Sequence, residues 1–325
     1  MKTTVSNTLI PKGRILYFNE EEHKYTDDLN SVYTSCTTLI GKYHGKFDKD
    51  AVAEACAKIG KNPNHPKYAR YAGKSKKQIL WEWEQETIRA CDKGTRKHNF
   101  LEDAIKSSNG YKRNANGFIN DRIYTIDNII QRHKYGILNL NNFKEKGVDK
   151  KYPKIYSLIE GFVNQGWKIY AEIGVYDSTA LISGLIDILL VKGDEFIILD
   201  WKTNKAPIRF ESGYYVKDIL GKLTDEFVFK NEFFHSPISH LPDSVGNHYA
   251  MQLSIYTYLV ESFGYKQKGR ILCHIRTIED AKDEEGNDVE VTEFYDIPYL
   301  KNEAESIINH YASQNINKSH VTLFN

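Results

Sequence analysis

The chain has few cysteines and methionines and no long apolar run. Of its 325 residues, four are cysteine and two are methionine. The cysteines are scattered and form no C-x-x-C pair, which excludes the usual spacing of a zinc finger. They are Cys36, Cys56, Cys91 and Cys273. No stretch approaches ~20 consecutive apolar residues, so we expect no transmembrane helix and no membrane partner. Low cysteine use and an N-terminus without an apolar stretch favour a cytoplasmic location.

The chain also has no excess of either charge. Its 44 basic and 43 acidic residues give a formal net charge of +1, so no global field attracts nucleic acid. Binding of nucleic acid must therefore depend on local basic clusters, in which tyrosines can add base stacking. A solvated helix surface is the ordinary alternative for each cluster. The candidate nucleic-acid contacts are Arg96, Lys97, Lys205, Tyr68 and Tyr71.

The most informative segment is 184–205, which reads GLIDILLVKGDEFIILDWKTNK. Two apolar runs, 180–191 and 196–199, flank a turn signal that contains Gly193, and this pattern predicts a β-hairpin. Side chains alternate along a strand, so Asp200 and Lys202 point the same way, and Asp187 can lie beside them if the strands pair around the turn. Two carboxylates and an ammonium are therefore expected at one edge of the sheet.

This combination suits the chemistry of phosphodiesters. Two carboxylates favour a hard cation such as Mg²⁺ or Mn²⁺, which in turn binds the oxygens of a phosphodiester. A lysine beside them can orient or deprotonate the attacking water, or offset the charge that develops on the phosphate. The ordinary alternative is a surface ion pair between Asp200 and Lys202, because Asp-x-Lys is a common tripeptide.

Two further motifs flank the hairpin. Residues 94–102 read GTRKHNFLE and residues 248–261 read HYAMQLSIYTYLVE. In this order the chain resembles the PD-(D/E)XK nuclease superfamily in its RecB-like branch, where G-T-x-x-H, G-x-x-D, D-x-K and Q-x-x-x-Y follow one another. The resemblance covers roughly residues 81–262. The matching residues are Gly94, Thr95 and His98, then Gly184 and Asp187, then Asp200 and Lys202, then Gln252 and Tyr256.

The resemblance implies a role for each of these residues. His98, Asp187, Asp200 and the backbone carbonyl of Trp201 are implied metal ligands, Lys202 the catalytic lysine, and Gln252 and Tyr256 residues that line the site. Helical spacing places His98 and Glu102 on one helix face, and Gln252 and Tyr256 on another. A structural role is the alternative for His98, and a place in the core is the alternative for Tyr256. Glu102 and Glu172 are second-tier candidates. An iron–sulfur cluster is not expected, because only Cys273 follows the Q-x-x-x-Y helix.

The N-terminal region is similar to a narrower group, the phage-encoded RecB-like nucleases and the mitochondrial genome maintenance exonucleases. Those proteins often begin with an F-x-x-x-x-H-x-Y hairpin that leads into S-x-T-T. The corresponding residues here are Phe18, His23, Tyr25, Ser35, Thr37 and Thr38.

We expect an α/β fold with a small mixed central sheet flanked by helices, and the resemblance implies that it is a restriction-endonuclease-like core. Residues 1–75 are expected to form an N-terminal hairpin and helical extension, and residues 76–325 the nuclease core. Helices are expected over 50–59, 76–104, 152–165 and 303–313, a late hairpin around 279–288, and polar loops over 110–117 and 138–151. The aromatic insertion at about 206–246 is expected to be a hydrophobic satellite or a lid over the cleft.

Together these features predict a Mg²⁺- or Mn²⁺-dependent deoxyribonuclease. The resemblance implies a phage-encoded exonuclease that acts on single-stranded DNA or free DNA ends in replication, recombination or repair. Partners would be DNA and replication or recombination proteins. The alternatives are a structure-specific or nicking endonuclease with the same site, and a DNA-binding subunit without turnover.

Overall fold

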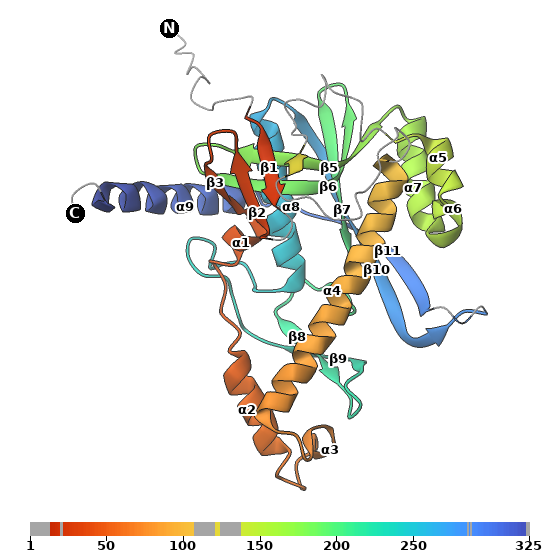
Figure 1. Ribbon diagram of the computed structural model, residues 1–325, viewed down its shortest axis with the longest axis vertical. Helices are drawn as coiled ribbons and strands as arrows, with labels where there is room; N and C mark the ends of the chain where they lie inside the picture. Colours follow the sequence, from red (N-terminus) through yellow and green to blue (C-terminus); the bar gives the residue numbers. More distant parts are fainter. Residues whose placement is uncertain are drawn as a thin grey trace.

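The computed structural model describes residues 14–19, 22–106, 121–123, 138–284, 286 and 288–322. These residues form an α/β structure in which helices flank a mixed central sheet (Figure 1). The strand order is β11-β10-β7-β6-β3-β2-β1-β4, and β5 also pairs with β6. The strands of this sheet are β1 Leu16–Asn19, β2 Lys24–Asp27, β3 Val32–Ser35, β4 Asp121–Ile123, β5 Lys168–Asp177, β6 Ile182–Lys192, β7 Glu195–Lys202, β10 Lys266–Lys282 and β11 Asp288–Asp296.

The predicted hairpin around Gly193 is confirmed. Strands β6 and β7 are antiparallel, with Ile188 opposite Leu199 and Lys192 opposite Glu195. Gly193 adopts a φ of 62° in the turn, a conformation that glycine adopts without a steric cost. On its other edge β7 pairs with β10 in parallel. The predicted late hairpin is formed by β10 and β11, which are antiparallel.

Strand β6 has an interrupted edge. Strand β5 pairs with β6 from Ile182 to Val191 along one edge. On the opposite edge, β3 pairs only with Ile182 and Ser183, and β7 pairs only from Ile188 onward. The sheet therefore opens between β3 and β7, and Asp187 lies in that opening.

Helices cover both faces of the sheet. Helices α1, α8 and α9 pack on one face, and the end of α4 together with α5, α6 and α7 packs on the other. The helices are α1 Cys36–Ile40, α2 Lys49–Ile59, α3 Tyr68–Tyr71, α4 Lys76–Lys106, α5 Leu140–Glu145, α6 Val148–Lys151, α7 Pro153–Asn164, α8 Val245–Ser262 and α9 Lys301–Thr322. Alternation along β7 divides its side chains between the faces: Ile198 joins the α8 side, whereas Leu199 and Trp201 join the α4 side.

The N-terminal hairpin is part of the main sheet. Strands β1 and β2 pair as expected, β3 joins them to β6, and Ser35 caps α1 by accepting from Thr38 N. Buried Cys36, Leu39 and Ile40 of α1 lie in the same core as α8. This part of residues 1–75 packs with the strands that carry the candidate site. Helices α2 and α3 form a separate small core with the start of α4.

The prediction of a polar loop over 138–151 is wrong, because two short helices, α5 and α6, form in this segment. Asn139 caps α5, and Phe143 and Val148 are fully buried in the core that α4, α5, α6 and α7 form with the sheet. Two apolar contacts thus stabilise helical turns in a segment whose other residues are mainly polar. The other predicted loop, 110–117, lies outside the described residues.

The aromatic insertion forms a second, two-stranded sheet of β8 Gly213–Lys217 and β9 Leu223–Phe229. Tyr215 and Phe227 pack against each other there, with ring centroids 5.1 Å apart. Phe234 is instead buried in the core that α1, α8 and α9 form with the main sheet. Among the described residues, no helix is long and apolar enough to span a membrane.

Candidate active site

A connected group of polar side chains lies at the end of β7, on the face covered by α8. Lys202 Nζ lies 2.5 Å from Asp200 Oδ2 and donates to Gln252 Oε1 over 3.1 Å. Gln252 Nε2 in turn donates to the Tyr256 hydroxyl over 3.0 Å. The D-x-K and Q-x-x-x-Y motifs thus form one hydrogen-bonded chain.

Asp187 reaches the same place from β6. Its Oδ2 accepts from Trp201 N over 2.9 Å and lies 3.7 Å from His98 Nδ1. Burial and the neighbouring Asp200 carboxylate raise the pKa of Asp187 to about 6. The sheet holds two carboxylates close together with little solvent, which disfavours ionisation of both.

Lys202 compensates part of this negative charge. Burial opposes its charged form, but the Asp200 and Asp187 carboxylates outweigh burial and raise the Lys202 pKa. Lys202 is therefore an ammonium at neutral pH. Its charge also lies over the Tyr249 ring, with Nζ 4.8 Å from the centroid.

The side chains around Asp187 suit a divalent cation, although the donor atoms of Asp187, Asp200 and His98 do not all lie within 4.8 Å of one another. Apart from its ion pair with Lys202, Asp200 Oδ2 is buried without a hydrogen-bond partner among the described residues. Two carboxylates and one imidazole are ligands that Mg²⁺ or Mn²⁺ accepts. The structure gives no contact for the predicted fourth ligand, the Trp201 carbonyl, so that role stays a prediction.

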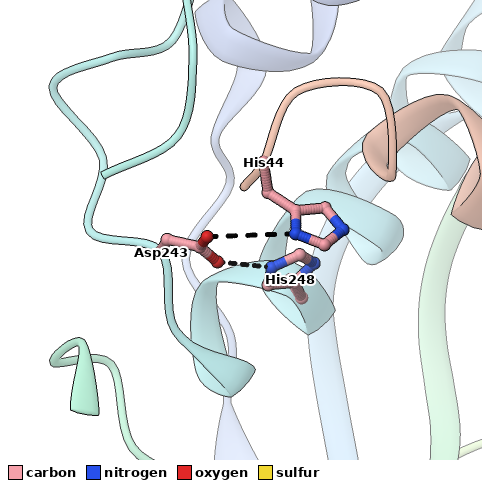
Figure 2. Close-up of side chains that lie close together, drawn as sticks. All are labelled: His44, Asp243 and His248. Carbon is pink, nitrogen blue, oxygen red and sulfur yellow. Dashed lines mark hydrogen bonds and ion pairs between the residues drawn. The ribbon is translucent and has the colours of Figure 1, made fainter. Parts of the chain in front are cut away.

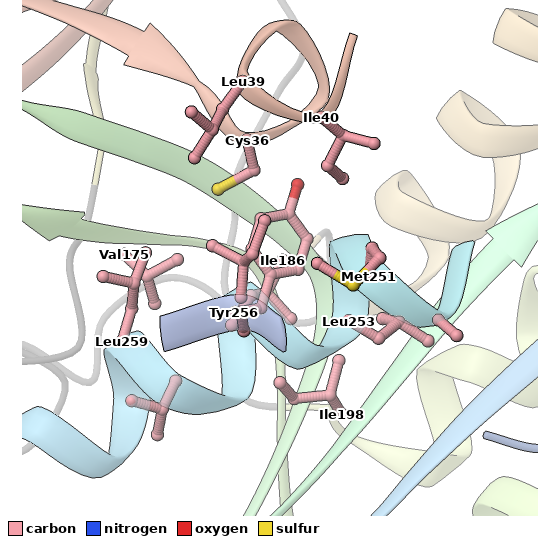
Figure 3. Close-up of a cluster of buried hydrophobic side chains, with 14 of the residues drawn as sticks. Cys36, Leu39, Ile40, Val175, Ile186, Ile198, Met251, Leu253, Tyr256 and Leu259 are labelled. Carbon is pink, nitrogen blue, oxygen red and sulfur yellow. The ribbon is translucent and has the colours of Figure 1, made fainter. Parts of the chain in front are cut away.

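The two motif glycines allow close approach at this site. A Cβ at Gly184 would lie 2.3 Å from Cε1 of Tyr256, so the tyrosine ring packs directly on the β6 backbone. A Cβ at Gly94 would lie 2.8 Å from Thr203 Oγ1, so α4 approaches the end of β7. Figure 3 shows Tyr256 among buried side chains of α1, α8 and the sheet. Tyr256 is thus both a core residue and the end of the polar chain.

Glu172 lies opposite Asp187. The register pairs Ala171 with Ile188 and Ile173 with Ile186, and Glu172 falls between them with a φ of 55°. A positive φ is uncommon for glutamate and marks a local break in the strand. Burial raises the pKa of Tyr25, and so do the nearby Cys36, Glu172 and Asp187. Tyr25 of the N-terminal hairpin therefore lies near the carboxylates of the same site.

Three residues near Lys202 were not expected. Tyr249 donates to Asn204 Oδ1 over 3.2 Å, and the buried His274 contacts the Asn204 carbonyl with Nε2 at 2.7 Å. These contacts fix the chain directly after Lys202. Tyr249 precedes Gln252 by three residues, so helical spacing could have identified it. His274 reaches Lys202 only through parallel pairing of β10 and β7, which no local pattern indicates.

Several other candidate site residues have partners within the protein. The Glu102 carboxylate pairs with Lys106 at 2.6 Å, and the buried Lys97 ammonium lies 2.5 Å from Glu290. Tyr71 is buried in the small core of α2 and α4, and Tyr68 is half-buried. Arg96 and Lys205 are exposed. The proposed roles of these residues stay predictions.

A groove runs along α4 from the small N-terminal core to the end of β7. It consists of hollows of about 750 Å³ and about 270 Å³ that share Lys93, Lys205 and Lys222 as lining residues. The smaller hollow also includes Thr203 and Asn204, directly after Lys202. The turn between β8 and β9 forms part of the lining of the larger hollow, with Ile219 and Leu220 largely exposed.

The groove lining has more basic than acidic side chains. Seven basic residues line it, against the four acidic residues Glu82, Glu86, Asp280 and Asp288. Most of these bases form ion pairs, but Arg70 and Arg89 have no carboxylate partner in the described ranges. The seven are Arg70, Lys74, Arg89, Lys93, Lys97, Lys205 and Lys222.

Comparison of the chain with protein-family models, curated proteins and solved structures finds no match.

Proposed function

We propose that this protein is a metal-dependent deoxyribonuclease with a PD-(D/E)XK-type core of the RecB-like branch. The observation that carries the proposal is the meeting of Asp187, Asp200, Lys202 and Gln252, from β6, β7 and α8, at an opening in the sheet. His98 of α4 faces the same carboxylates. This donor set suits metal-dependent phosphodiester hydrolysis, which supports the proposal.

Each side chain has a distinct task in the proposed reaction. Asp187, Asp200 and His98 would hold Mg²⁺ or Mn²⁺, which when bound supplies positive charge for the phosphate oxygens. Lys202, a cation held by Gln252, orients the attacking water and offsets charge on the phosphate. Gln252 and Tyr256 keep the lysine aligned, because their hydrogen bonds leave its amine little freedom.

The groove supports an exonucleolytic reaction on single strands. A strand that lies along α4 would pass Arg70 and Arg89 and reach Thr203 and Asn204, which directly follow Lys202 in the chain. The β8–β9 turn lies across from α4 and offers exposed Ile219 and Leu220 to bases. We propose that a strand enters this groove by a free end.

The test is a cleavage assay with Mg²⁺ or Mn²⁺ on end-labelled linear single strands, linear duplex and closed single-stranded circles. We expect degradation of the linear strands and resistance of the circles. Lys202→Ala should abolish cleavage while circular dichroism and binding of the labelled strand persist. A Lys202→Ala protein that cleaves at the parent rate would refute the assigned mechanism.

The same assay separates the alternatives. Rapid cutting of closed circles would indicate an endonuclease with an open cleft and would leave the site assignment intact. Binding without cleavage under all metal conditions would indicate a DNA-binding subunit. A matched RNA strand in the same assay decides between the two nucleic acids.

A further inference from the structure

A second group of metal-ligating side chains lies outside the candidate active site. His44, Asp243 and His248 offer two ring nitrogens and one carboxylate oxygen that all lie within 4.8 Å of one another. Within the described ranges, this is the one such group with so short a separation. Figure 2 shows the Asp243 carboxylate facing both imidazoles.

The distances within this group are close to those of a coordination sphere. Asp243 Oδ1 lies 2.8 Å from His248 Nε2, and Asp243 Oδ2 lies 3.9 Å from His44 Nδ1. Tetrahedral zinc with bonds of roughly 2.0–2.1 Å requires donor atoms about 3.3 Å apart. The two distances go to different carboxylate oxygens, and one is below this value and the other above it. Both imidazole rings must therefore shift for three donor atoms, which already lie within 4.8 Å of one another, to reach that separation.

No hydrogen bond among the described residues holds the His44 ring, which packs edge-to-face against the His248 ring with centroids 4.8 Å apart. A separation of 3.9 Å is too long for a hydrogen bond, and among the described residues His44 has no other hydrogen-bond partner. Its imidazole nevertheless points at the carboxylate. The side chains of His44, Asp243 and His248 keep 33%, 18% and 29% of their surface exposed, so an ion and a water ligand can reach them.

The backbone that carries the three ligands is fixed. His248 is in the first turn of α8, and its ring packs on Phe234 with centroids 4.7 Å apart. Asp243 N donates to the Glu232 carbonyl over 2.9 Å. The Tyr43 carbonyl, next to His44, accepts from His235 N over 2.6 Å. Two segments far apart in sequence, one around His44 and one that carries Asp243 and His248, are thus held in place before any ion binds.

We propose that His44, Asp243 and His248 bind one zinc-class ion, with water in the fourth position. Two imidazoles and one carboxylate favour Zn²⁺ and other late divalent metals over Mg²⁺, which prefers oxygen ligands. The ion would link the segment after α1 and the segment before α8 to α8 itself. Gln252 lies one turn further along that helix, so the ion would steady the helix that carries the Lys202 partner. The proposal does not depend on the nuclease assignment.

An ordinary alternative is that Asp243 and His248 form a hydrogen bond that stabilises the start of α8, with His44 as a bystander. A cation at a helix N-terminus is also opposed by the helix dipole. Coordination bonds from three ligands exceed that effect, which is confined to the first turn. The two interpretations differ in whether His44 matters for binding of the metal.

The experiment is isothermal titration of metal-stripped, full-length protein with Zn²⁺ in excess Mg²⁺, which competes for oxygen-rich sites. We expect a zinc equivalent that does not depend on His98, and at least tenfold weaker binding at that site in His44→Ala and in His248→Ala. His240→Ala is the matched control. His240 is an exposed histidine in the same segment as Asp243, and its side chain pairs with Glu303. His98→Ala should also retain the zinc, which separates this site from the candidate active site.

A second readout covers the case in which a variant is unstable. Zn²⁺ should raise the melting temperature of the parent and of His98→Ala, but not of His44→Ala, whose loop position leaves the metal-free fold intact by circular dichroism. Co²⁺ should give the visible absorption of a tetrahedral site only where His44 is present. Unchanged zinc binding in His44→Ala, no zinc binding by the parent, or loss of zinc only in His98→Ala would each overturn the proposal.

Discussion

Asp187 and Asp200 are adjacent carboxylates that the structure stabilises differently, and replacing each by asparagine should therefore have opposite effects on stability. The Asp187 carboxylate is destabilised by burial and by the Asp200 charge. Asp200, 1% exposed, has the Lys202 ammonium at 2.5 Å. Without added metal, Asp187→Asn should stabilise the protein, and Asp200→Asn should destabilise it because Lys202 loses its partner.

The magnitude for Asp187 follows from its pKa. A rise from 3.8 to about 6 corresponds to about 3 kcal/mol of unfavourable free energy in the ionised folded protein. The folded state binds the proton more tightly, so between pH 3.8 and about 6 the stability of the parent falls as pH rises. Asparagine does not titrate, and its amide oxygen still accepts from Trp201 N. Asp187→Asn should thus gain about 1 to 3 kcal/mol above pH 6 and nothing below the unfolded-state pKa.

The assay is urea unfolding in a metal chelator at several pH values, with the free energy of unfolding compared between parent and variant. Asp200→Asn is the control and should lose up to about 3 kcal/mol, since the buried Lys202 ammonium then keeps only the more distant Asp187 carboxylate. Mn²⁺ should then stabilise the parent but not Asp187→Asn. A gain that is the same at low and neutral pH, or a loss at neutral pH, would refute the reasoning about Asp187.

Three other substitutions test separate features. Gly184→Ala should destabilise by about 1 to 3 kcal/mol in urea unfolding, because its Cβ meets a tyrosine ring of α8, whereas Gly161→Ala, with open space around it, should not. Arg70→Gln and Arg89→Gln should each reduce the salt dependence of single-strand binding, by about 0.7 in the slope of log K against log salt; an unchanged slope would place the strand elsewhere. His98→Ala should weaken Mn²⁺ more than Mg²⁺ in calorimetry, because imidazole is the softer ligand, and equal losses would contradict its role as a ligand.

The sequence by itself determined the local elements of the site. Apolar runs on either side of Gly193 specify two strands and a turn, and the alternation of a strand places Asp200 and Lys202 on one side. Helical spacing likewise places Gln252 and Tyr256 on one face. Each of these features depends on residues a few positions apart, so periodicity is enough to predict it. The short helices α5 and α6 escaped prediction because burial of Phe143 and Val148, rather than periodicity, stabilises them.

Only the tertiary structure decided how these elements meet. The opening that exposes Asp187 exists because β3 and β7 pair with different parts of the same β6 edge. Parallel pairing of β10 with β7 brings His274 beside Lys202. Likewise, His44 and His248 meet only when α1 and α8 share a core. The choice of strand partners and helix contacts depends on the packing of the whole chain, and a local sequence pattern holds no information about which distant edge or face will be available.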